Sequence, residues 1–310
     1  MVISTDVSAP LITVFGATGT QGGSVIAHLL SSSRAYRIRA VTRDPSKPSG
    51  KKLGEKGCEV VKAEMGDSKQ VDEAVKGAQM VFGVTNFWEH GAKKEIEDGK
   101  ILINAIKQNL STIKTFIWSG LEPVRKISNG KYTHVEHFDT KAELTELAKK
   151  EGLPIIDVQP AMYMENFLGA MAPRKQQDGS YAFWFPGSPD SKLNLIHCKR
   201  DYGAYVVGAI EGGAPDGEVL ACADVITTSE LAATWGEANG VKCSYAPAPV
   251  DQFKAMVGDE FTEMLQYFAE FGYYGGKDVT ASQAVLAENA RVQTWREFVK
   301  AEDWSKVLSG

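Results

Sequence analysis

One segment near the start of the chain reads Leu11-Ile12-Thr13-Val14-Phe15-Gly16-Ala17-Thr18-Gly19-Thr20-Gln21-Gly22. Its unbroken apolar run, residues 11–15, predicts a strand that is buried on both faces. Apolar residues then return at helical spacing beyond the glycines, at Val25, Ile26, Leu29 and Leu30. A strand, a tight glycine turn and a helix in this order form a cradle for a dinucleotide, whose pyrophosphate lies at the positive end of the helix.

The three glycines of this segment have separate expected roles. Gly16 permits the turn, Gly19 lets backbone N–H groups reach the pyrophosphate, and Gly22 lets the helix pack closely on the strand. The alternative is a tight turn between strand and helix that binds no ligand. The position of the glycines between a buried strand and a helix favours the cradle.

The overall composition limits the kind of protein and its partners. The 310 residues suffice for one large α/β domain or for a Rossmann domain with a smaller appendage. A formal net charge of −5 argues against nucleic acid as a partner. No apolar run approaches the length of a membrane span, and residues 1–10 lack the pattern of a secretory signal. We therefore expect a cytoplasmic protein, with the nucleus as the alternative, and no membrane partner.

The cysteines point to the same kind of compartment. The chain has four of them, Cys58, Cys198, Cys222 and Cys243, and none forms a C-x-x-C pair. We interpret them as buried thiols of a reducing compartment. The sequence shows no cluster of ligand residues with metal-site spacing, so we expect no metal.

Strands and helices alternate over the first half of the chain. Further strands are predicted at residues 37–42, 58–65, 79–85, 115–118 and 155–159, and helices at 68–76 (capped by Asp67), 95–108 and 138–150. This alternation predicts an α/β fold in residues 1–160, a Rossmann-type doubly wound parallel sheet.

The alternation ends after Pro160. We expect residues 161–310 to form a smaller C-terminal α+β region that binds a substrate or a partner, interleaved with the first domain because residues 193–223 add to the sheet. The pattern there predicts an irregular stretch to Pro189, strands at 193–197 and 218–223, and helices capped by Asp201 and Ser229. One helical face carries Phe261, Met264, Leu265, Phe268 and Phe271. We interpret this face as part of the core or as a lid over a cleft, and a dimer surface is another alternative.

The end of the second strand indicates which dinucleotide is bound. An acidic residue there binds the ribose 2′-hydroxyl of NAD, whereas an arginine suits the 2′-phosphate of NADP. Here Arg43 stands at that point, with Ser46 and Lys47 close behind it. Because the guanidinium is planar and always charged, we predict NADP(H) rather than NAD(H). A solvated basic loop is the alternative.

Several motifs together resemble those of the NmrA-like family, atypical members of the short-chain dehydrogenase/reductase superfamily. The resemblance covers residues 9–300. It is densest in the glycine segment 16–23 and in four further segments, Thr85-Asn86-Phe87-Trp88-Glu89, Ser119-Gly120-Leu121-Glu122, His137-Phe138-Asp139-Thr140-Lys141 and Tyr163-Met164-Glu165-Asn166.

The resemblance implies a set of contacts to NADP(H). Residues 16–22 would hold the pyrophosphate, and Arg43 and Lys47 the 2′-phosphate. Glu64 and Met65 would flank the adenine, although the family often has Asp-Leu there. The resemblance further implies that Thr85, Asn86 and Phe87 line the ribose and nicotinamide side, that Lys141 bonds the nicotinamide ribose, and that Tyr163, Met164, Glu165 and Asn166 close over the nicotinamide.

The expected catalytic pair is incomplete. Typical members of the superfamily use Tyr-x-x-x-Lys on one helix, where the lysine helps the tyrosine to donate a proton as hydride moves. Here Lys141 is present, but His137 stands four residues before it. His137 could act as an acid, because imidazole titrates near neutral pH, or it could only pack beside the cofactor. Tyr163 is a substitute donor, whereas Tyr132 is predicted to lie on the surface.

Two functions remain open from the sequence. The missing tyrosine favours an NADP(H)-binding redox sensor that responds to the cofactor and binds a protein partner, with a homodimer left open. The alternative is an enzyme with an aromatic cleft for a bulky aromatic, carbonyl, imine or quinone substrate, either an NADPH-dependent reductase or a non-redox catalyst of a cyclisation. The candidate aromatic residues for the walls of that cleft are Phe87, Trp88, Tyr163, Phe167, Phe183, Trp184 and Phe185. We expect about half of them to lie in the core instead.

Overall fold

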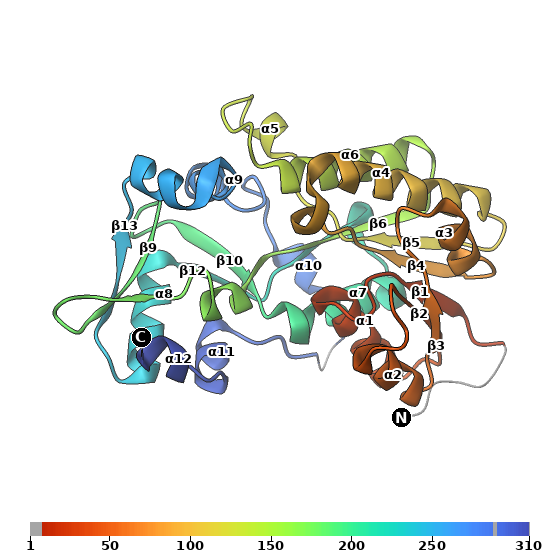
Figure 1. Cartoon of the computed structure of the whole chain (residues 1–310), viewed down its shortest axis with the longest axis horizontal. Helices are drawn as coiled ribbons and strands as arrows, with labels where there is room; N and C mark the ends of the chain where they lie inside the picture. Colours follow the sequence, from red (N-terminus) through yellow and green to blue (C-terminus); the bar gives the residue numbers. More distant parts are fainter. Residues whose placement is uncertain (1–7, 288–289, 310) are drawn as a thin grey trace.

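The computed structural model of the chain describes residues 8–287 and 290–309, so most of the segment tested for a secretory signal lies outside it. Seven parallel strands form one sheet in the order β11-β6-β5-β4-β1-β2-β3 (Figure 1). They are β1 (Leu11–Val14), β2 (Arg37–Thr42), β3 (Glu59–Lys62), β4 (Met80–Gly83), β5 (Thr115–Trp118), β6 (Ile155–Pro160) and β11 (Glu218–Ala221). The predicted Rossmann-type sheet is confirmed, and β1 and β4 are buried at every residue, as central parallel strands require.

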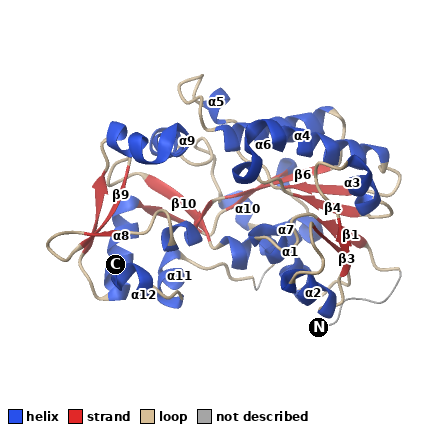
Figure 2. Ribbon diagram, in the orientation of Figure 1, coloured by secondary structure: helices blue, strands red, loops and turns tan. Residues whose placement is uncertain are grey.

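Helices cover both faces of this sheet (Figure 2). One face carries α3 (Ser68–Val75), α4 (Phe87–Gln108) and α6 (Glu136–Lys150), and the other carries α1 (Thr20–Ser31), α2 (Pro48–Glu55) and α7 (Cys198–Gly212). Each face has its own apolar cluster, one containing Val81 and Leu102 and the other containing Val25 and Tyr202. Among the helices of residues 8–287 and 290–309, none is both long and apolar enough to cross a membrane.

A smaller part with two three-stranded sheets lies beside the main sheet (Figure 2). One sheet has the order β12-β10-β7 and the other β13-β9-β8. The strands are β7 (Met162–Tyr163), β8 (Arg174–Lys175), β9 (Tyr181–Phe185), β10 (Lys192–Ile196), β12 (Asp224–Thr227) and β13 (Cys243–Pro247). The helices are α8 (Thr228–Asn239), α9 (Val250–Phe271), α11 (Trp295–Ala301) and α12 (Ser305–Ser309); shorter ones elsewhere are α5 (Val124–Ile127), α10 (Thr280–Gln283) and the 3-10 turns η1 (Met164–Leu168) and η2 (Pro215–Gly217).

Several local predictions in this second half are wrong. The stretch to Pro189 is not irregular, because it holds β7, η1, β8 and β9. Asp201 lies inside α7, where its carboxylate accepts the backbone N–H of Gln293 at 2.8 Å. Thr227, not Ser229, caps α8, because Thr227 and Glu230 form a reciprocal capping box. Cys243 is half-buried, whereas the other three cysteines are buried, and all four are free thiols.

Glycines interrupt the two longest helices, α4 and α9. α4 begins at Phe87 rather than at the predicted Glu95, but Gly91 has φ +75° and separates a first turn, residues 87–90, from the rest. Gly258 has φ +85° and divides α9 in the same way. Positive φ is accessible to glycine without strain. Each break changes the direction of the chain, so residues 87–90 of α4 and residues 250–257 of α9 are not continuous with the rest of their helices.

One buried carboxyl group makes stability depend on pH. Asp157 of β6 is 2% exposed, and its Oδ2 accepts hydrogen bonds from Gln159 and Thr145. Burial raises the pKa of Asp157 from 3.8 to about 7. Between these two pH values the unfolded chain has lost the proton that the folded chain keeps. The free energy of unfolding therefore falls as pH rises from about 4 to about 7.

The substitution Asp157→Asn removes this titration. We expect the variant to lose less thermal stability than the wild type between pH 5 and pH 8, with a difference of up to about 2.5 kcal/mol. The measurement is the unfolding midpoint at both pH values, with the exposed Asp190→Asn as the matched control. Parallel pH profiles of wild type and Asp157→Asn would show that Asp157 is ionised in the fold throughout this range.

Candidate functional site

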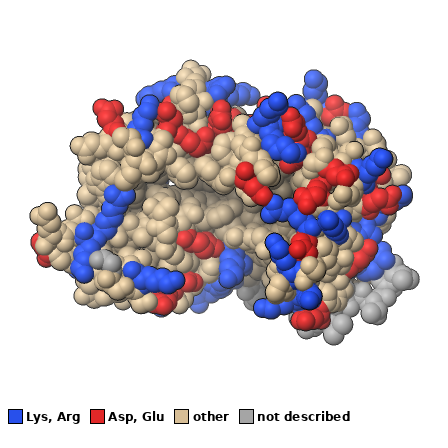
Figure 3. Space-filling view, viewed as in Figure 1, with Lys and Arg blue, Asp and Glu red and all other residues tan. Residues whose placement is uncertain are grey.

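A cleft of about 910 Å³ opens at the carboxyl ends of the sheet strands, facing the smaller part. Figure 3 shows the surface hollowed between the two parts, with few charged side chains in the hollow. Charged side chains line one end of the cleft, Arg43, Glu64, Glu89, Lys94 and Asp98. Uncharged side chains line the other, Met171, Phe261, Met264, Phe268 and Tyr273. A phosphate-bearing ligand suits the first end and a flat apolar one the second.

The glycine turn between β1 and α1 has the geometry of the predicted cradle. Gly16 has φ +63°, and a Cβ on Gly22 would lie 2.3 Å from the Gly16 carbonyl oxygen, so neither position tolerates a side chain. Gly19 occupies the N-cap position of α1, and the N–H groups of the first turn behind it have no acceptor within the helix. Residues 16 and 18–22 line the cleft, whereas Ala17 is buried behind it. The turn fits a pyrophosphate.

Arg43 lies at the end of β2, where it lines the cleft. Its guanidinium forms an ion pair with Glu89 from the first turn of α4, and the Arg43 side chain is 62% exposed. The arginine lowers the pKa of the Glu89 carboxyl by hydrogen bonding, so Glu89 is anionic. A 2′-phosphate on Arg43 would therefore compete with Glu89. Lys47 is exposed before α2 and does not line the cleft.

The expected adenine end lies next to Arg43. Glu64 and Met65 both line the cleft, as does Gly66. A Cβ on Gly66 would lie 2.7 Å from the Lys94 Nζ, and Lys94 in turn pairs with Asp98 on α4. Sequence analysis missed this ion pair, although its i, i+4 spacing on a helix is a recognisable signal.

Lys141 is held by a buried carboxylate that sequence analysis missed. Glu95 of α4 has no exposed side-chain surface, and it pairs with Lys141 and accepts hydrogen bonds from Thr85 and Thr140. Burial lowers the pKa of Lys141, and Glu95 opposes that shift. The available signal was its spacing, since Glu95 shares one helical face with the buried Leu102. Thr85 and Lys141 line the cleft, as do Asn86 and Phe87.

His137 lies where the superfamily has tyrosine, in the first turn of α6, and it lines the cleft. Its Nδ1 is hydrogen-bonded to Glu260 of α9. Among the residues that the structure describes, none is hydrogen-bonded to Nε2. The ring of Trp88 lies 4.9 Å from that of His137 and stacks on Phe261, also at 4.9 Å. Burial lowers the pKa of His137, against the raising effect of Glu260.

The segment after β6 lies only partly in the cleft. Tyr163 and Asn166 line it. Met164 is fully buried, and Glu165 is turned away: its carboxylate accepts the backbone N–H groups of Cys198 and Lys199 and so caps α7. Desolvation, followed by the Cys198 thiol, raises the pKa of Tyr163 well above its usual range, which makes the hydroxyl a weaker acid.

The seven aromatic side chains that were predicted to converge on the cleft divide between cleft and core. Phe87, Trp88 and Tyr163 line the cleft. The others do not, because Phe167, Phe183 and Phe185 are buried in the core of the smaller part and Trp184 packs against Phe253 and Arg174. Of the apolar face on α9, Phe261, Met264 and Phe268 line the cleft, in agreement with a lid.

Tyr132 is not on the surface, contrary to prediction. It is 5% exposed, and its hydroxyl donates a hydrogen bond to Glu270 at 2.8 Å. Its ring packs against those of Tyr267 and Phe271 on α9. Tyr132 therefore anchors the loop before α6 and does not line the cleft.

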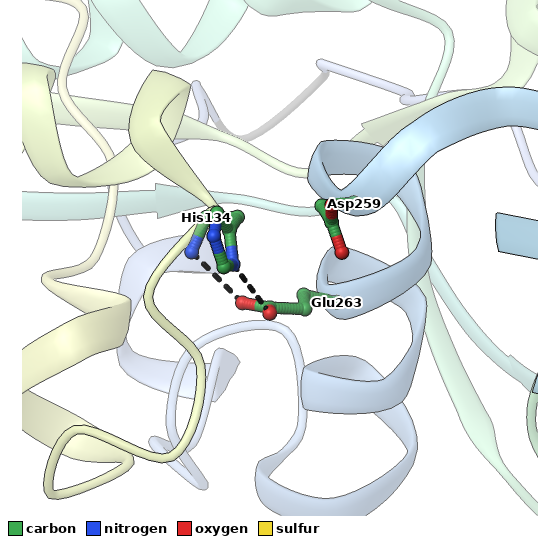
Figure 4. A group of neighbouring side chains, drawn as sticks. All are labelled: His134, Asp259 and Glu263. Atoms are coloured by element: carbon green, nitrogen blue, oxygen red, sulfur yellow. Dashed lines mark hydrogen bonds and ion pairs between the residues drawn. The ribbon is translucent and has the colours of Figure 1, made fainter.

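His134, Asp259 and Glu263 have ligand atoms within 4.8 Å of one another (Figure 4). Each already has a protein partner. Glu263 accepts the backbone N–H groups of Thr133 and His134 and bonds the His134 ring at 2.6 Å, and Asp259 pairs with Lys254 at 2.5 Å. We assign this group an anchoring role between α9 and the loop before α6.

The sheet, the glycine turn and the cleft at the strand ends define the class, a Rossmann-type dinucleotide-binding α/β protein. Within that class the chain belongs to the NmrA-like family, whose model matches residues 8–299.

Curated relatives match nearly the whole chain. The NmrA-like family domain-containing oxidoreductase ptmS of Penicillium ochrochloron is 26% identical, over 94% of this chain and 93% of its own. The oxidoreductase cpsB of Aspergillus campestris, described in the same words, is 27% identical, over 96% of each.

Solved structures share the fold. Nmra, a negative transcriptional regulator, superposes with a TM-score of 0.79 at 17% identity, covering 97% of this chain and 98% of its own. The NADPH-dependent quinone oxidoreductase QOR2 of Escherichia coli, in complex with NADPH, has a TM-score of 0.72 at 23% identity, covering 93% and 98%.

Proposed function

We propose that this protein is an NADP(H)-dependent reductase of a bulky, flat and uncharged carbonyl, imine or quinone compound. The observation that carries the proposal is the position of His137 in the cleft: its Nδ1 is bound to Glu260 and its Nε2 has no partner among the described residues. Relatives named as oxidoreductases support the same chemistry.

The residues of the cleft divide the work of binding. The glycine turn would hold the pyrophosphate, Arg43 the 2′-phosphate, and Lys141 the nicotinamide ribose. The fit rests on the turn itself, where a Cβ on Gly22 would collide with the Gly16 carbonyl and the first N–H groups of α1 have no acceptor within the helix. When bound, NADPH supplies the hydride of the reduction. The apolar end of the cleft excludes water around the substrate and suits a flat ring system.

His137 supplies the proton in this proposal. The imidazolium gives the Nε2 proton to the oxygen or nitrogen of the substrate and is left neutral, with the remaining proton on Nδ1 facing Glu260. Solvent then restores the proton on Nε2. Lys141 is paired with Glu95 and does not take part in this transfer.

The second candidate function is an NADP(H) sensor. It is favoured by His137, which stands in place of the tyrosine, and by the ion pair that Lys141 already forms with Glu95. The likeness to the Nmra structure is compatible with it, although similarity at 17% identity speaks for the fold alone.

One sample distinguishes the candidates. We would titrate NADPH by calorimetry and then follow the loss of its absorbance with a panel of quinones, aldehydes and imines. We expect binding and oxidation above background with flat aromatic substrates. Binding without oxidation by any of them would reject the reductase and leave the sensor or a non-redox catalyst, and the next experiment would be limited proteolysis with NADPH against NADP.

A further inference from the structure

The carboxylate of Glu260 serves both the backbone and the side chain of the segment that contains His137. Glu260 lies in the turn that follows Gly258, where α9 resumes after its break. It accepts the backbone N–H groups of Glu136 and His137, each at 3.1 Å, and it bonds Nδ1 of His137. The side chains of His137 and Glu260 are 11% and 19% exposed, so the pair is largely removed from solvent.

We propose that Glu260 is the positioning residue for His137, holding Nδ1 so that Nε2 is presented to the cleft for proton transfer. This inference rests on the proposed reductase function. A carboxylate that accepts from Nδ1–H selects one tautomer of the neutral ring and stabilises the imidazolium before transfer. The hydrogen bonds from the backbone of the first turn of α6 hold the Glu260 carboxylate beside the ring, because His137 belongs to that same turn.

The chain contains a matched pair of histidine and glutamate nearby. Glu263, three residues further along α9, accepts two backbone N–H groups and bonds the ring of His134. This second pair anchors the same loop, but His134 is 57% exposed and does not line the cleft. Both pairs therefore anchor the loop. Only the pair of Glu260 and His137 also presents a ring nitrogen to the cleft.

Charged groups from three helices act on the His137 ring. Burial among Phe87, Trp88 and Phe138 has the largest effect and lowers the pKa of His137. Glu260 of α9 and Glu95 of α4 raise this pKa, and Lys141 of α6 lowers it. Replacement of Glu260 by glutamine removes one of the two carboxylates that raise the pKa of His137, and it is the one hydrogen-bonded to the ring. The protonated fraction of His137 then falls at any pH near neutrality.

The test compares Glu260→Gln with Glu263→Gln, and with Glu260→Asp as the variant that retains the charge. The first readout is the imidazole titration of His137 by NMR of ¹⁵N-histidine-labelled protein, assigned by the signal missing from His137→Gln. We expect its midpoint to fall by about one pH unit or more in Glu260→Gln and to stay within about 0.3 in Glu263→Gln. The second readout is the pH profile of kcat with NADPH and a quinone, whose decline at high pH shifts by the same amount.

The outcomes are separable from those of the proposed function. If the wild type oxidises no NADPH with any substrate, the reductase proposal fails, and the NMR titration still tests whether Glu260 controls His137. If the wild type is active and Glu260→Gln changes neither the titration nor the pH profile, the positioning role is overturned. If Glu260→Gln is too unstable to measure, Glu260→Asp takes its place: the shorter carboxylate weakens the contact with Nδ1, so a pH profile shifted to lower pH supports the positioning role and an unshifted profile overturns it.

Discussion

Arg43→Ala is expected to weaken NADP(H) binding by about 100-fold and NAD(H) binding by less than about twofold. Arg43 is the guanidinium at the end of β2 that lines the cleft. A charge-assisted, bidentate contact to the 2′-phosphate exists only for NADP(H), so its loss discriminates between the two cofactors. The measurement is calorimetric titration of both cofactors at the same ionic strength, since the contact is exposed and screened by salt.

Glu89→Gln is the matched variant for this experiment. Glu89 pairs with Arg43, so it competes with the 2′-phosphate and repels it. We expect Glu89→Gln to tighten NADP(H) binding by about threefold and to leave NAD(H) binding unchanged. Equal losses for both cofactors in Arg43→Ala would contradict the role of Arg43 at the 2′-phosphate, and weaker NADP(H) binding in Glu89→Gln would contradict the competition.

The parts of the fold that sequence analysis predicted are those determined by local pattern. The strands of the main sheet before residue 160 lie in short segments rich in apolar and β-branched residues, so each was identified within a few residues. β7, β8, β9, β12 and β13 were missed. They are short, and β9 pairs with β13, whose Cys243 lies opposite Tyr181, far away along the chain. No local pattern indicates such a pairing, because the aromatic run of β9 is buried by distant elements.

The candidate site shows the same division. The glycine turn and Arg43 belong to motifs within one βα unit, so their places in the cleft followed from sequence. Glu89, Glu95 and Glu260 did not. Each is a carboxylate on a helix that would ordinarily face solvent, and each is brought to a cationic or imidazole partner by packing. The electrostatics of this cleft therefore depend on tertiary contacts that the motifs do not contain.

His137→Gln is expected to lower kcat of the proposed reduction by about 100-fold or more, with NADPH affinity within about twofold of wild type. His137 is the ring whose Nε2 is free to face the substrate, whereas Tyr163 has a pKa raised well above its usual range and a hydroxyl beside the buried Cys198. Tyr163→Phe should therefore retain at least about a third of the wild-type kcat. The measurement is steady-state oxidation of NADPH with the best quinone or aldehyde of the panel.

His134→Gln provides the control for the His137 substitution. It breaks an equivalent histidine–glutamate pair on the same loop without touching the cleft, so kcat should stay within about twofold of wild type. A loss in His134→Gln as large as that in His137→Gln would mean that the loop, rather than the ring of His137, is what catalysis requires. If His137→Gln kept the wild-type kcat and Tyr163→Phe lost it, the proton donor would be Tyr163. Substrate binding would then have to relieve the desolvation that raises the pKa of Tyr163.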